Sequence, residues 1–156
     1  MVALSALWMG AALAGFEGMS PDVVAVGDVT VEPVTLTARL ADLRRGGDLW
    51  DEACAVGWTS TTADRAWARW TPGPMNRKVA LAVVELQPGR KVKWEAEGDR
   101  GFFVHWRVEA REGGSRVTVE TPLLAPPWPV RGVFYRKVQP AWKACYEQAI
   151  RRLGAP

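Results

Sequence analysis

The chain has 156 residues, which is the length of one domain. Apolar residues make up 48% of it and charged residues 24%, as in soluble globular proteins, so a disordered chain and a multi-span membrane protein are excluded. Lysine and arginine together number 20, and aspartate and glutamate 17, which gives a net charge of +3. Because the basic residues are scattered rather than gathered in one stripe, we expect no nucleic-acid partner.

The N-terminal residues 1–18 are mostly apolar, and no lysine or arginine occurs before Arg39. The apolar stretch is shorter than the roughly 20 residues of a membrane-spanning helix and lacks the basic start of a signal peptide. We interpret it as an extension that is signal-like, an anchor or an upstream-start artefact, with a single domain over residues 19–156. A cytoplasmic location is favoured. Secretion, or membrane contact through the N-terminal segment, stays open.

One strand and two short helices are predicted next. Residues 24–32 are rich in β-branched side chains, which predicts a strand. Residues 33–43 begin with proline and repeat leucine at helical spacing, which predicts a short helix. We expect Gly46 and Gly47 to break the chain and a second short helix to follow over 48–52, capped by Asp48.

Six further strands are predicted from alternating apolar and polar residues. In one of them, Val92, Trp94 and Ala96 share a face, and four charged residues occupy the other. The six strands are predicted over residues 53–61, 65–71, 78–86, 90–97, 102–111 and 116–121. Since such strands have one apolar face each, the antiparallel sheet must bury that face against another element.

A long C-terminal helix supplies the missing surface. Apolar residues recur every three or four positions from Val130 to Leu153, which is one stripe of a helix. Pro140 interrupts this stretch, and we expect it to kink the helix.

The order of these elements resembles the helix-grip fold of the START-like, or SRPBCC, superfamily, to which Bet v 1-like proteins belong. Residues 40–52 look like its pair of short helices, 84–94 like its strand–Pro-Gly–strand turn, and 105–120 like its late strands with a Gly-Gly hairpin. The branch resembled most is the bacterial polyketide cyclase/dehydrase-like group, over residues 24–153. Neither the N-terminal extension nor Pro140 belongs to the family pattern.

The resemblance implies an α+β fold in which a curved antiparallel sheet of about seven strands wraps around the C-terminal helix. It also implies a cavity between sheet and helix for a hydrophobic ligand. Some members of the superfamily turn over the ligand and many only carry or sense it, so the fold alone leaves the chemistry undecided.

Nine tryptophans stand out in the composition. If the alternation is interpreted correctly, many of them face the cavity, where aromatic rings bury apolar ligands by area and stacking. Whether they line a pocket or fill a core stays open. The residues predicted to face inward are Trp58, Trp70, Trp94, Trp106, Val117, Val119, Phe134 and Trp142, and those predicted to bind ligand are Trp58, Trp70, Trp94, Trp106, Phe134 and Trp142.

Candidates for acid–base chemistry are few, and we assign no catalytic residue. His105, the single histidine, alternates onto the face opposite Trp106 and is expected at the solvent side. Asp51 is expected either near the cavity mouth or as a cap of a helix end. Tyr135 and Tyr146 could donate hydrogen bonds inward or be half-buried core residues.

No cofactor and no metal site are expected, because one histidine cannot form a histidine cluster. Cys54 and Cys145 could pair, but we expect them to be free and buried like small hydrophobic residues. The loop over 71–77, and the segment over 123–129 with Trp128, are expected either to flank the cavity entrance or to be packed linkers.

These observations favour a protein that binds or carries a hydrophobic small molecule: a lipid, a polyketide or an aromatic compound. One alternative is a polyketide cyclase- or dehydratase-like enzyme acting in the same cavity. A second alternative is a protein- or membrane-interaction module whose cavity is filled. The oligomeric state is not predicted.

Overall fold

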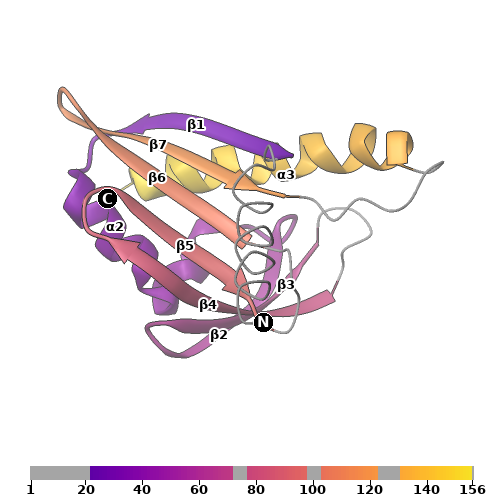
Figure 1. The fold of residues 1–156 in the computed structure, drawn as a ribbon. Coiled ribbons are helices and arrows are strands. Elements are labelled where there is room, and N and C mark those ends of the chain that lie inside the picture. Colours follow the sequence, from indigo (N-terminus) through magenta and orange to yellow (C-terminus); the bar gives the residue numbers. More distant parts are fainter. Residues whose placement is uncertain (1–21, 72–76, 98–102, 123–130, 156) are drawn as a thin grey trace, which may run out of the picture.

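The computed structural model describes residues 22–71, 77–97, 103–122 and 131–155. Its architecture is the α+β helix-grip arrangement, in which a curved antiparallel sheet packs against a long C-terminal helix (Figure 1). The sheet has seven strands in the order β1-β7-β6-β5-β4-β3-β2. The elements are β1 (Val23–Val29), α2 (Pro33–Ala41), the 3₁₀ helix η1 (Leu43–Leu49), β2 (Ala55–Thr62), β3 (Arg65–Trp70), β4 (Arg77–Gln87), β5 (Lys91–Ala96), β6 (Phe103–Arg111), β7 (Gly114–Thr121) and α3 (Arg131–Leu153).

The predicted strands are confirmed, with ends displaced by a few residues. On β5 and β6 the alternation holds closely: Val92, Trp94, Val104 and Trp106 are fully buried, and their neighbours along each strand are more exposed. Trp94 pairs with Val104 across the two strands, and Val92 pairs with Trp106. The buried face of the sheet is therefore continuous from strand to strand.

The second short helix is present, but its predicted position over residues 48–52 was wrong. The 3₁₀ helix η1 lies earlier than expected and contains Gly46 and Gly47, with the side chain of Asp42 accepting a hydrogen bond from Arg44 N at its start. The two glycines lie against the ring of Trp58, and a Cβ on Gly46 would overlap that indole. They permit a close approach of backbone to ring, whereas we had expected a chain break.

The short helices are tied to the sheet by hydrogen bonds that involve backbone atoms. Gly89 N, in the turn between β4 and β5, donates to Thr37 Oγ1 of α2 at 2.9 Å. Leu43 N of η1 donates to Ala63 O, in the turn between β2 and β3, at 2.7 Å. These bonds hold α2 and η1 against the sheet.

The helix α3 runs along one face of the sheet and contacts β1 and η1 (Figure 1). Its buried stripe follows the predicted spacing, and Pro140 lies on its exposed side. The helix continues through Pro140, so the proline does not end it. In the part of the chain that the structure describes, no helix is both long and apolar enough to cross a membrane.

Candidate functional site

An aromatic cluster occupies the space between the sheet and α3. Neighbouring rings in it have centroids 4.9 to 6.4 Å apart, which is direct contact. All its members are buried except Trp58, which is partly buried. The aromatic cluster consists of Trp50, Trp58, Trp70, Trp94, Trp106, Trp142 and Tyr146.

Local geometry brings these rings together. Trp70, Trp94 and Trp106 stand on inward-facing positions of β3, β5 and β6, where side chains alternate between the two faces. Trp142 and Tyr146 are four residues apart on α3, so they lie on one face of the helix. The cluster therefore joins residues from both sides of the interface.

The indole N–H groups divide into two kinds. Trp58 Nε1 donates to Leu43 O at 2.8 Å, and Trp94 Nε1 donates to Leu40 O at 2.8 Å. The Nε1 atoms of Trp50 and Trp106 are buried and have no hydrogen-bond partner among the described residues. A buried donor without a partner costs about 1–3 kcal/mol, so these two donors are suited to an acceptor from outside the chain.

Tyr146 packs against both of these indoles. Its ring centroid lies 5.7 Å from that of Trp50 and 6.3 Å from that of Trp106, while the two indoles are 6.4 Å apart. Burial raises the pKa of Tyr146 well above its usual value, and the nearby Thr121 hydroxyl offsets only part of that rise. The phenol therefore stays protonated at neutral pH and acts as a hydrogen-bonding group, not as a base. We name Trp50, Trp106 and Tyr146 the polar corner of the cluster.

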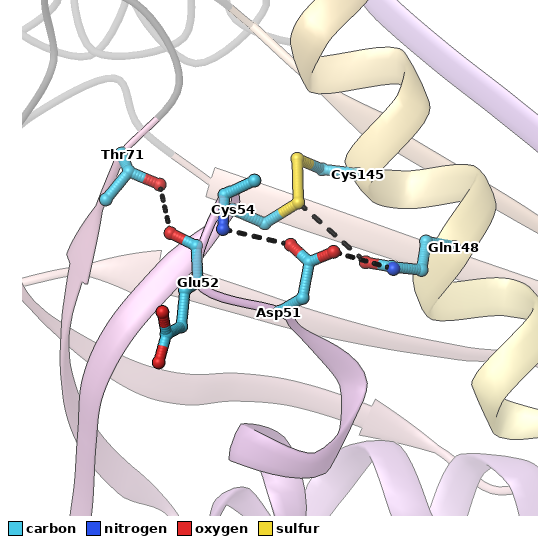
Figure 2. Close-up of a disulfide and its surroundings, with 7 residues drawn as sticks. Asp51, Glu52, Cys54, Thr71, Cys145 and Gln148 are labelled. Carbon is cyan, nitrogen blue, oxygen red and sulfur yellow. Dashed lines mark hydrogen bonds between the residues drawn. A yellow bond between two sulfur atoms is a disulfide. The ribbon is translucent and has the colours of Figure 1, made fainter.

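The two cysteines form a disulfide, which contradicts the expectation that they are free. Cys54, just before β2, is bonded to Cys145 of α3, with the Cα atoms 5.7 Å apart (Figure 2). The cause is tertiary: the fold brings the start of β2 beside the middle of α3, which the spacing in the sequence does not reveal. The disulfide fixes the helix to the sheet beside the aromatic cluster.

Asp51 serves the same connection rather than the interior of the cluster. Its carboxylate accepts hydrogen bonds from Ala53 N at 3.0 Å and from Gln148 Nε2 of α3 at 2.8 Å (Figure 2). Of the two roles considered for Asp51, capping a local backbone turn is the one these bonds support. The second bond also reinforces the link to α3.

His105 lies on the face of the sheet opposite Trp106, as predicted. Burial, and then the nearby Arg107, lower the pKa of His105 below its usual value. Its position on the outer face separates it from the aromatic cluster. Within the described ranges, no three His, Cys, Asp or Glu residues are grouped closely enough to hold a metal ion.

Five of the six predicted binding residues meet in the cluster: Trp58, Trp70, Trp94, Trp106 and Trp142. Phe134 lies on α3, but its side chain is outside the described part of the structure, as are that of Tyr135 and residues 72–76 and 123–130. Sequence reasoning missed Trp50, which was assigned to a helix. Its backbone is extended, and it contacts Trp70, Trp106 and Tyr146.

No protein-family model matches the chain, and none of the curated proteins matches it. Several solved structures share its fold. The KanY protein (ms6282) is 16% identical with a TM-score of 0.71, and the match covers 87% of this chain and 97% of that one. TTHA0849 from Thermus thermophilus is 17% identical with a TM-score of 0.58, covering 85% and 93% of the two chains.

A third structure, DynU16, comes from the dynemicin biosynthetic locus. It is 16% identical with a TM-score of 0.50, and the match covers 85% of this chain and 45% of DynU16. At these identities the likeness establishes the fold alone. The chain therefore has the helix-grip fold that its resemblance to the START-like superfamily predicted.

Proposed function

We propose that this protein binds or carries a hydrophobic small molecule in the aromatic cluster between the sheet and α3. The main support is the pair of buried indole donors on Trp50 and Trp106 that find no acceptor among the described residues. An apolar ligand that carries one acceptor oxygen, such as a polyketide or an aromatic ketone, would bury its rings among the indoles and accept a hydrogen bond from one of them.

The alternative of a cyclase or dehydratase acting in the same place has weaker support. Such an enzyme needs an acid or base within reach of its substrate. Among the described residues, the buried polar side chains outside the cluster are hydroxyls: Thr37, Ser115 and Thr121. Tyr146 is held in its neutral form by burial. DynU16 comes from a biosynthetic locus. This is a property of DynU16, and it is the reason for retaining the enzymatic alternative for the present chain.

The second alternative, an interaction module with a filled cavity, has one observation in its favour. The rings of the cluster touch one another, so they already fill part of the space that a ligand would use. The carrier proposal therefore requires that a ligand displace or separate some of these rings. This requirement makes binding directly testable.

The test compares two probes of nearly equal size, fluorenone and fluorene, which differ by one carbonyl oxygen. We expect fluorenone to quench the intrinsic tryptophan fluorescence with saturation and to bind more tightly than fluorene. The Trp106→Phe variant keeps an aromatic ring and loses the N–H group, so it should weaken fluorenone binding about fivefold and leave fluorene binding unchanged.

Trp67→Phe is the matched control, because Trp67 is 48% exposed and lies outside the cluster. It should leave the binding of both probes as in the parent protein. Absence of a saturable response to either probe, and to a panel of fatty acids, would favour the filled-cavity alternative. Turnover of a bound polyketide would favour the enzyme.

The disulfide bears on the location of the protein. Disulfides persist mainly in oxidising compartments and are rare in the cytosol, so the Cys54–Cys145 bond favours export over the cytoplasmic location that the N-terminal residues 1–18 suggested. The intact mass of the protein purified from its host shows both at which residue the chain begins and whether the two cysteines are oxidised. Two free thiols with an intact N-terminus would contradict export.

A further inference from the structure

A cleft lies away from the aromatic cluster, where the C-terminal end of α3 meets α2 and η1. Its volume is about 480 Å³, and it shares no residue with the cluster. We name it the arginine cleft. Its lining residues are Arg39, Arg45, Asp48, Leu49, Arg152, Leu153 and Ala155.

The arginine cleft carries excess positive charge. Three guanidinium groups and one carboxylate line it, which leaves a net charge of +2. None of these arginines forms an ion pair with a described residue, whereas Arg44, directly beside Arg45 in the sequence, pairs with Asp42 at 2.8 Å. Guanidinium groups without a carboxylate partner are the usual recognition elements for carboxylates and phosphates.

Two of the three guanidiniums are held in position by the backbone. Arg39 Nη1 donates to Leu153 O at 3.2 Å, and Arg152 Nη1 donates to Asp48 O at 3.3 Å. Each bond joins α3 to one of the two short helices. Since a guanidinium has five N–H donors, each keeps others for a ligand, and fixing the side chain beforehand lowers the entropic cost of binding.

The floor of the cleft is apolar. Leu49 and Leu153 are buried residues of η1 and α3 that border the cleft beneath its charged rim. A fully hydrated inorganic anion would gain nothing from contact with these apolar side chains. A cationic rim over an apolar floor matches an amphipathic anion, with an acidic head group and a short hydrocarbon or aromatic body.

We propose that the arginine cleft is a binding site for the carboxylate or phosphate group of an amphipathic small molecule. The site is independent of the aromatic cluster, so it stands or falls separately from the function proposed above. In this arrangement Arg39, Arg45 and Arg152 hold the head group, and the body of the ligand covers Leu49 and Leu153.

The experiment exploits two neighbouring arginine pairs in the sequence. The variant R45Q/R152Q removes two cleft charges, and the control R44Q/R151Q removes the same number of charges from adjacent residues that do not line the cleft. The probes for isothermal titration calorimetry are hexyl phosphate, hexanoate, inorganic phosphate and hexanol. Comparing the first two distinguishes a phosphate from a carboxylate ligand.

We expect the parent protein and R44Q/R151Q to bind hexyl phosphate or hexanoate more tightly than inorganic phosphate or hexanol. R45Q/R152Q should bind the same probe at least about tenfold more weakly, and added salt should weaken binding to the parent. Equal affinities of the two double variants, or equal binding of hexanol and the anions, would overturn the proposal.

Should R45Q/R152Q fail to fold, the single variants R45Q and R44Q make the same comparison. The Arg45 side chain makes no hydrogen bond or ion pair to a described residue, so its removal leaves the links between α3 and the short helices intact. Equal binding by these two single variants would likewise overturn the proposal.

Discussion

The Cys54–Cys145 disulfide should stabilise the fold by an amount that follows from the length of the loop it closes. It joins residues separated by 91 positions, so it closes a loop that spans more than half of the chain. The chain-entropy relation for a loop of that length gives about 4.6 kcal/mol of stabilisation, by restricting the unfolded state. Domains of this kind are stable by only about 5–15 kcal/mol, so the loss is a large share of the total.

The double variant Cys54→Ala/Cys145→Ala should therefore lower the free energy of unfolding by about 4.6 kcal/mol and the melting temperature by roughly 9–18 °C. Guanidinium unfolding and thermal melts followed by circular dichroism measure both quantities. The parent protein in strong reductant should behave like the double variant. Two reactive thiols in the native, unreduced protein, or a double variant as stable as the parent, would refute the reasoning.

Two further predictions concern a packing contact and a titration. Gly46→Ala should destabilise the fold by about 1–3 kcal/mol because its Cβ would overlap Trp58, whereas Gly132→Ala, whose Cβ meets nothing within 4 Å, should be neutral or slightly stabilising; equal melting temperatures would contradict this. The folded-state pKa of His105 is depressed by burial and Arg107, so the unfolded chain binds more protons between that pKa and 6.5, and stability should rise with pH across this window. His105→Gln should flatten that rise in the free energy of unfolding, and an unchanged slope would show that other groups cause it.

The sheet could be predicted from the sequence because its period is short and its faces differ. Residues 92–96 alternate between buried and more exposed side chains in the sequence and in the structure alike. A strand with one apolar face needs no distant information to be recognised. The apolar stripe on α3 from Val138 to Leu153 could be predicted for the same reason, because its spacing is local and its two faces differ.

The features that escaped prediction depend on contacts between residues apart in the sequence or, for Trp50, on where a helix ends. Gly46 was interpreted as a chain break because its partner, the Trp58 ring, becomes visible only in the folded structure. Trp50 was assigned to a helix because its extended backbone is set by the end of η1. Local pattern cannot supply such contacts, and the same holds for the disulfide.

The tryptophans of the aromatic cluster differ in the use of their indole N–H groups. Trp94 donates to Leu40 O in the last turn of α2, where helix carbonyls lack partners within the helix. Trp58 donates to Leu43 O at the start of η1, so both indoles join the short helices to the sheet. Trp50 and Trp106 are buried too, yet serve no such carbonyl in the described structure. We therefore propose that the rings divide by the use of their indole N–H: a ring whose donor is used by the backbone supports the fold, and a ring whose donor is unused has hydrogen-bonding capacity left for a ligand.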